Sequence, residues 1–187
     1  SNLKKPVIST ACPAVLELIL VKYHNLCDNL LNLLAPVDVA AKMARERAEK
    51  RGIPSEDIGV FFISPCPAKV FAEKCGLGVG KPYVDGILAN SEIYFKLLPI
   101  INKLEKTDVE SLSRMGILGL QWASSGGETA AAFRDKYLAA DGLENVIKIL
   151  NALEDDTLTD VDFIELNACT SGCVGGVMNV ENPFIAK

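Results

Sequence analysis

The sequence lacks a long apolar run, a secretory signal and a positive net charge. In this chain of 187 residues the apolar stretch AVLELILV stops at Lys22, far short of the roughly 18 residues that cross a bilayer. The N-terminus has no charged, apolar and small-residue layout of a signal peptide. The formal net charge is −5, and the basic residues of KMARERAEKR alternate with acids. We therefore expect neither a membrane span nor a nucleic-acid surface.

Histidine is almost absent, and the cysteines do not form the close pairs of structural zinc sites. His24 is the only histidine, and no two of the six cysteines are separated by two residues, the usual spacing of structural zinc ligands. Six thiols without a secretory signal predict a reducing, cytoplasmic compartment, where cysteines bind metal, react or fill the core. Zinc and disulfides are therefore the disfavoured interpretations of these cysteines.

The composition provides enough apolar residues for one sizeable core. Hydrophobic residues make up 49% of the chain and charged residues 23%, which is typical of a globular protein. No internal repeat, low-complexity tract or long linker interrupts the sequence, so we expect one compact unit over residues 1–187. Ser1 and Asn2 have the character of a cloning remnant, and we expect the natural chain to begin upstream.

Residues 3–57 are predicted to be a mainly helical segment. Pro13 is suited to a first helical turn, and the apolar residues after it recur every three or four positions. A short second helix is expected over CDNLLNLLAP. A third helix is expected to begin at Pro36 and to stop at Gly52.

Residues 58–187 are predicted to alternate strands with helices. We expect strands in IGVFFIS, covered on both faces, in YVDGILAN and in VDFIEL, whereas RMGILGLQWASSGG is ambiguous between a short strand and a loop. Helices are expected in SEIYFKLLPIINKLEK, capped by Ser91 and bent or ended by Pro99, in ETAAAFRDKYLAAD and in GLENVIKILNALED. Such alternation predicts an α/β fold with crossover helices and a mainly parallel sheet. Ligands of such sheets collect beyond the carboxyl ends of the strands.

Four cysteines stand at positions suited to an iron–sulfur cluster. Cys12 precedes a predicted helix, Cys66 follows a predicted strand, and Cys169 and Cys173 lie four residues apart in NACTSGCVGG. Thiolates from three separate segments would form a cage for a cubane 4Fe-4S cluster. Taken alone, the pair spaced by four is a weak signal, and a structural or incidental role for it stays open.

Three glycines surround the last cysteine. Gly172, Gly175 and Gly176 would let the backbone approach a bulky inorganic group, adopt positive φ and direct N–H groups at its sulfurs. Without a cluster, they are simply turn residues.

Five segments spread along residues 9–176 in a fixed order: STACPAV, SPCPAKVF, ASSGGETAAAFR, GLENVIKIL and DFIELNACTSGCVGG. Together they resemble the catalytic large subunit of iron-only hydrogenases, whose active-site cluster joins a four-iron cubane to a diiron unit. The two cysteine–glycine segments are the more specific part of the match. The resemblance implies that this chain is a fragment of a two-lobed active-site domain about twice as long.

The resemblance also implies a role for five side chains. Cys12, Cys66, Cys169 and Cys173 look like the four cubane ligands, with Cys173 bridging to the diiron unit. Lys69 matches the family lysine that holds a cyanide ligand of that unit. Three residues after Cys66, its ammonium would share the face of the cysteine and offset an anionic cluster, although a solvated surface lysine remains the alternative.

The sequence departs from the family pattern at three positions. Ala11 replaces the cysteine that relays protons in active hydrogenases, so direct proton delivery by that route is absent. Ser64 and Asn167 replace two methionines, which predicts a more polar pocket. Cys27 and Cys75 match no ligand and are expected to be core or surface thiols.

The resulting expectation is a 4Fe-4S domain within a larger protein. Proton and dihydrogen chemistry is one function, and hydrogen or redox sensing stands slightly ahead, because the pattern ACPAV is nearer to sensory members of the family. A cubane-only protein for electron transfer or cluster handling is the alternative. The expected partners are an electron-donor ferredoxin or attached iron–sulfur domains, with a signalling domain in a sensory parent. The isolated fragment is expected to be inactive.

Overall fold

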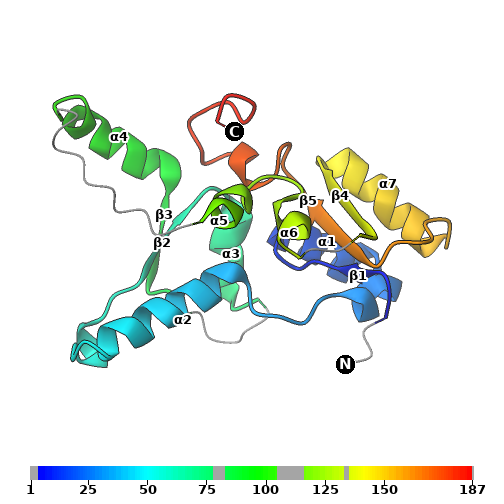
Figure 1. The fold of residues 1–187 in the computed structure, drawn as a ribbon, viewed down its shortest axis with the longest axis horizontal. Helices are drawn as coiled ribbons and strands as arrows, with labels where there is room; N and C mark the ends of the chain where they lie inside the picture. The colour runs from blue at the N-terminus through cyan, green and yellow to red at the C-terminus, as the bar shows by residue number, and fades with distance from the viewer. Residues whose placement is uncertain (1–3, 78–82, 105–115, 133–134, 187) are drawn as a thin grey trace.

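The computed structural model describes residues 4–77, 83–104, 116–132 and 135–186, and its strands form two parallel sheets. One sheet has the strand order β1-β5-β4, and the other pairs β2 with β3. In Figure 1 the sheets lie in two groups of elements, with α3 and α5 between them.

The strands are β1 (Val7–Ile8), β2 (Phe61–Ser64), β3 (Gly86–Ala89), β4 (Tyr137–Asp141) and β5 (Phe163–Asn167). The helices are α1 (Pro13–Lys22), α2 (Pro36–Glu49), α3 (Pro67–Cys75), α4 (Asn90–Ile101), α5 (Ile117–Gln121), α6 (Gly127–Ala131) and α7 (Leu143–Glu154), with 3-10 turns η1 (His24–Asn29), η2 (Ser55–Asp57) and η4 (Cys173–Gly175). The α/β class and the parallel pairing are confirmed, but the strands divide between two sheets.

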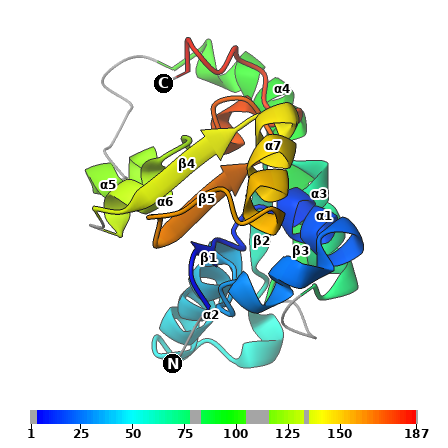
Figure 2. The same ribbon diagram turned by 90° about the vertical axis from the view of Figure 1, so that its right-hand side faces the viewer.

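The main core joins the beginning of the chain to its end. β1 pairs in parallel with β5, so that Ile8 stands beside Ile164. Helices α1 and α7 pack on this sheet (Figure 2), and burial of their apolar side chains is the main stabilising contribution. Besides its helices, the segment 3–57 thus supplies a strand to the shared sheet. The core consists of Ile8, Val15, Ile19, Tyr23, Leu26, Val146, Leu150, Leu153, Ile164 and Leu166.

The helices predicted to begin at Pro13 and Pro36 are confirmed as α1 and α2, and Gly52 follows α2 with a φ of 84°. The helix predicted over CDNLLNLLAP is wrong. A 3-10 turn, η1, ends at Asn29, and the backbone then pairs with β1, where the N–H of Leu31 donates to the carbonyl of Ile8 at 2.9 Å. This bond holds the segment in an extended conformation.

Two predictions in the second half of the chain are wrong. ETAAAFRDKYLAAD is not one helix, because α6 ends at Ala131 and β4 begins at Tyr137. One edge of β5 pairs with β1, and β4 pairs in parallel with the other edge of β5. RMGILGLQWASSGG forms the short helix α5 and not a strand, although its first two residues lie outside the described ranges. By contrast, the predicted helix GLENVIKILNALED is confirmed as α7.

Helix α4 begins one residue before the predicted cap. Its N-cap position is Ala89, whose N–H donates to the carboxylate of Glu92 at 3.4 Å, so the prediction of Ser91 as cap is wrong. Pro99 lies inside the helix, which ends at Ile101. None of the helices in the described parts of the chain is both long and apolar enough to span a membrane.

The small sheet of β2 and β3 has one open face. Phe61 and Ile63 point outward and are 64% and 49% exposed, whereas Ser64 is fully buried. The prediction that the strand in IGVFFIS is covered on both faces is therefore wrong among the described residues, although the strand itself is confirmed. This sheet places Cys66 two residues beyond the carboxyl end of β2.

Candidate metal centre

The four cysteines predicted as ligands all follow the carboxyl ends of parallel strands. Cys12 comes four residues after β1, Cys66 two residues after β2, and Cys169 two residues after β5, with Cys173 beginning the turn η4. Cys12 and Cys66 are the N-cap residues of α1 and α3, each followed by a proline. A helix N-terminus favours negative charge, so both positions suit a ligand of an anionic metal cluster.

Cys169 and Cys173 both respond to the thiols of the other segments. Burial raises the pKa of Cys169, and the thiols of Cys66, Cys12 and Cys173 raise it further. Burial also raises the pKa of Cys173, the Lys69 ammonium opposes this effect, and the thiols of Cys12 and Cys66 add to it. Interactions of this kind require the groups to be neighbours. The fold thus brings together the thiols of three segments that are far apart in sequence.

The remaining thiols lie elsewhere, and all six cysteines are free. Cys27 packs against the main core, and Cys75 is exposed at the end of α3. In the described part of the chain, no three His, Cys, Asp or Glu side chains are close enough together to hold one metal ion. Ligands of a single zinc ion all lie within about 2.3 Å of it, whereas each thiolate of a cubane binds a different iron. The donor set suits a cluster better than an ion.

Lys69 and Cys173 line a cavity of about 460 Å³, here called the central cavity. Lys69 lies in the first turn of α3, and its Nζ donates to the carbonyl of Ala11 at 3.0 Å. The lysine is therefore held against the segment that carries Cys12, and not extended into solvent. Its charge lowers the pKa of both Cys169 and Cys173, so it favours the thiolate forms that bind iron.

The two polar replacements have different surroundings. Asn167 lines the central cavity and donates to the carboxylate of Glu165 at 3.0 Å. Ser64 is buried beneath the turn of Cys66, where its hydroxyl donates to the Cys66 carbonyl at 3.0 Å and accepts from the Cys66 N–H at 3.2 Å. Only Asn167 therefore brings polarity to the cavity, while Ser64 shapes the backbone of a predicted ligand.

The segment ASSGG supports the cysteine–glycine turn. The N–H of Val174 donates to the carbonyl of Ala123 at 3.1 Å, and Ser124 forms an antiparallel bridge with Gly172. Glu165 of β5 holds this segment in turn, because its carboxylate accepts the N–H groups of Gly126 and Thr129 at 2.9 Å each. These donors open α6, so a buried strand residue stabilises the start of a neighbouring helix.

The predicted cofactor-binding glycines each approach another part of the backbone. A Cβ on Gly175 would lie 1.9 Å from the carbonyl oxygen of Thr170, and one on Gly176 would lie 2.3 Å from that of Pro65. Gly172 has a φ of 77° and would bring a Cβ to 2.7 Å from the N atom of Ser125. The close packing of chain segments around Cys173 thus requires glycine, and a contact of these glycines with a cofactor stays a prediction.

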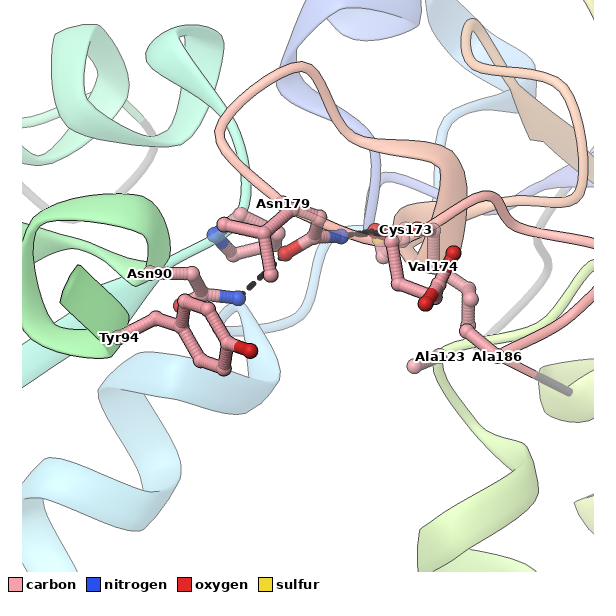
Figure 3. Close-up of a pocket in the computed structure, with 10 residues that line it drawn as sticks. Asn90, Tyr94, Ala123, Cys173, Val174, Asn179 and Ala186 are labelled. Carbon is pink, nitrogen blue, oxygen red and sulfur yellow. Dashed lines mark hydrogen bonds between the residues drawn. The ribbon is translucent and has the colours of Figure 1, made fainter. Parts of the chain in front are cut away.

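Cys173 also lines a second pocket of about 460 Å³, here called the outer pocket (Figure 3). Asn179 is one of the residues that line the outer pocket. Its Nδ2 donates to the carbonyls of Cys173 at 3.0 Å and Val174 at 2.8 Å, and its Oδ1 accepts from Nδ2 of Asn90 at 2.5 Å. The start of α4 is thereby connected to the turn that carries a predicted ligand.

The family model of the iron only hydrogenase large subunit, C-terminal domain, matches residues 1–138 and 103–177. The chain belongs to this hydrogenase family. The family binds an iron–sulfur cofactor, the H-cluster, and the arrangement of thiols described above fits such a group. No curated protein sequence matches the chain.

Solved hydrogenases share the fold. The chain is 17% identical to the FeFe-hydrogenase HydA1 from Chlamydomonas reinhardtii in a glutamate-to-glutamine variant, with a TM-score of 0.69. It gives the same identity and TM-score with the apo form of a cysteine-to-histidine variant from that alga. A structure of HydA(deltaEFG), described for stepwise H-cluster assembly, gives 17% and 0.67. In each case 95% of this chain is covered, but only 62% of the hydrogenase.

Sequence reasoning on this hydrogenase domain missed several residues that shape the site. Glu165 had a visible signal, because a carboxylate inside the apolar strand VDFIEL needs a buried partner. Asn179 had none, since one asparagine after a glycine-rich turn is indistinguishable from an ordinary loop residue. Its role depends on Asn90, which is 89 residues away in the sequence.

Proposed function

We propose that this chain is an iron–sulfur redox domain of the iron-only hydrogenase type, in which Cys12, Cys66, Cys169 and Cys173 hold a 4Fe-4S cluster. The observation that carries the proposal is the position of thiols from three segments beyond the carboxyl ends of parallel strands. Cys12 and Cys66 lie near enough to raise the pKa of both Cys169 and Cys173. A bound cluster of this kind supplies one-electron redox chemistry.

The protein's own groups prepare the site for anionic ligands. Burial raises the pKa of Cys169 and Cys173, so the uncharged thiols are favoured until metal displaces their protons. The Lys69 ammonium and the N-termini of α1 and α3 offset the negative charge of the thiolates. Cys173 lies on the boundary between the cage and the central cavity, which is where a thiolate bridging to a diiron unit would stand.

Within the intact protein, sensing of hydrogen or redox state is favoured over rapid catalysis. Ala11 cannot titrate, and its carbonyl accepts from Lys69 beside the central cavity. A proton relay at this position is therefore missing. We further propose a reducing, cytoplasmic setting, an electron-donor ferredoxin or attached iron–sulfur domains as partners, and a signalling domain in the parent chain.

A cubane-only protein for electron transfer or cluster handling is the second candidate. The contact between Lys69 and Ala11 favours it, because a lysine that donates to the backbone at 3.0 Å has one donor fewer for a ligand in the central cavity. In this alternative the four cysteines keep their role, and the central cavity holds no diiron unit.

Anaerobic reconstitution with iron and sulfide tests cluster binding. We expect about four iron atoms per chain in the wild type and in the Cys75→Ser control, whose thiol is exposed and outside the cage. The Cys169→Ser and Cys173→Ser variants should lose this iron. Equal iron contents in all four proteins would refute the proposed ligand set.

Two further measurements separate the candidate functions. After maturation of the intact protein, infrared bands of carbon monoxide and cyanide identify a diiron holder, and their absence identifies a cubane-only protein. Hydrogen evolution by an Ala11→Cys variant, compared with the wild type, then tests the missing relay. A higher rate of hydrogen evolution in the variant supports the proposal that Ala11 limits turnover. Equal rates in the two proteins contradict this proposal.

A further inference from the structure

Two buried carboxylates meet at the central cavity without complete hydrogen bonding. Asp38 on α2 is 3% exposed, and Glu73 on α3 is 7% exposed. Both residues line the cavity, and within the described parts of the chain Oδ1 of Asp38 and Oε2 of Glu73 have no hydrogen-bond partner. An unpaired buried anion is strongly unfavourable. The pair therefore needs a neutralising species.

The surrounding charges do not provide full neutralisation. The backbone N–H of Tyr83 donates to the Asp38 carboxylate, and the Lys69 ammonium acts on Glu73. Among the described residues lining the cavity, Lys69 is the only lysine or arginine, and it also serves the thiols and the Ala11 carbonyl. Two more carboxylates line the same cavity, Glu128 and Glu165. Among the described residues that line this cavity, negative groups thus outnumber positive ones.

The carboxylates of Glu128 and Glu165 differ from those of Asp38 and Glu73 because they accept hydrogen bonds from nearby donors. Glu165 accepts two backbone N–H groups and the Asn167 amide. Glu128 accepts the hydroxyl of Ser9 at 2.6 Å. The unpartnered oxygens of Asp38 and Glu73 have almost no solvent-accessible area, and within the described residues no third acidic or thiol ligand joins them around a common ion. A proton needs neither space nor additional ligands, so it suits these oxygens better than a hydrated cation.

We propose that Asp38 and Glu73 form a redox-linked proton site. The pair takes up one proton from water when the cysteine cage gains an electron from an external one-electron reductant, and it returns the proton when the electron leaves. No covalent bond forms except the O–H bond of the carboxyl group. This inference rests on the proposed function, because the electron resides on the cluster held by the cage.

The coupling between the two sites follows from charge. Asp38, Glu73 and Cys173 line the same cavity, and the Lys69 ammonium acts on both Glu73 and Cys173. An added negative charge in the cage favours the neutral form of a nearby acid. Burial and the repulsion from Asp38 already raise the pKa of Glu73, with Lys69 opposing them, and burial raises that of Asp38. Both carboxyl groups therefore already favour the protonated form, and added negative charge in the cage favours it further.

The decisive experiment measures the reduction potential of the reconstituted protein against pH. For the wild type we expect the potential to fall by about 59 mV per pH unit, the value for one proton per electron, over the range in which the pair titrates. The Asp38→Asn, Glu73→Gln double variant, which keeps the shapes and removes both acids, should lose this slope. Glu46→Gln, on the exposed side of α2, should keep it.

Carboxyl titration provides the independent readout. In the chain without iron, carbon NMR of Asp38 and Glu73 should show both groups titrating above their ordinary ranges. Ordinary titration, a wild-type potential independent of pH, or an unchanged slope in the double variant would each overturn the proton site. A chain that binds no iron after reconstitution would instead refute the proposed function, so the two failures are distinguishable.

Discussion

The side-chain amide of Asn179 donates to the main-chain carbonyl of Cys173 at 3.0 Å. The same Nδ2 also donates to the carbonyl of Val174 at 2.8 Å, and Oδ1 is held by Asn90 (Figure 3). These bonds fix the turn η4 from outside the cysteine cage. Asn179 is thus a positioning residue for the proposed ligand Cys173.

Replacing Asn179 with alanine should destabilise this turn. The Asn179→Ala variant removes the amide donor from the carbonyl of Val174 and, among the described residues, leaves the carbonyl of Cys173 with only the N–H of Gly176. The loss costs about 1–3 kcal/mol, and it should lower the iron retained per chain. The control Asn90→Ala removes only the outer bond and should cost about 1 kcal/mol. Urea unfolding and iron analysis measure both effects. Equal losses in the two variants would contradict a specific role for the bonds to Cys173 and Val174.

The turn around Cys173 should not tolerate a side chain at Gly175. In Gly175→Ala the new Cβ would stand 1.9 Å from the carbonyl oxygen of Thr170, so the backbone must shift, at a cost of about 2 kcal/mol or more. Gly116→Ala is the control, because no atom of the described residues lies within 4 Å of the Cβ that it would add. Its stability should change by no more than about 0.5 kcal/mol. Thermal or urea unfolding compares the variants, and a neutral Gly175→Ala would show that the turn is loosely packed.

The stability of the protein should decrease as pH rises through the acidic range. Burial raises the pKa of Glu128, the Ser9 hydroxyl opposes this, Glu165 raises it further and Lys69 lowers it. The folded state therefore binds this proton more tightly than the unfolded chain. The free energy of unfolding falls as pH rises from the unfolded pKa to the folded one, and the proton has no further effect outside that interval.

Urea unfolding at a series of pH values between about 4 and 7 measures this dependence. Glu128→Gln removes one of the titrating groups and should flatten the curve, although Asp38 and Glu73 contribute with the same sign. Glu46→Gln, an exposed residue of α2, should follow the wild type. A Glu128→Gln curve as steep as that of the wild type would mean that Glu128 is already ionised in the folded state at low pH.

Local sequence patterns predicted the secondary structure correctly where it depends on residues that are close together in the sequence. Helices α1 and α2 begin at prolines that suit a first turn, and α7 follows an apolar period that any amphipathic helix shows. The same reasoning failed at YLAAD, which has helix-forming residues yet lies in β4. That segment pairs with β5 along its whole length, and a pairing partner outweighs weak local propensity.

The amino-acid order was enough to identify the four candidate cysteine ligands, because their motifs and their places after predicted strands are local properties. It was also enough to predict the α/β class. The packing of the chain places these thiols near one another, turns Lys69 back to Ala11 and brings Asp38 and Glu73 to one cavity. Each of those relationships joins residues far apart along the chain. Their distances depend on how two separate parallel sheets pack, and no local pattern carries that information.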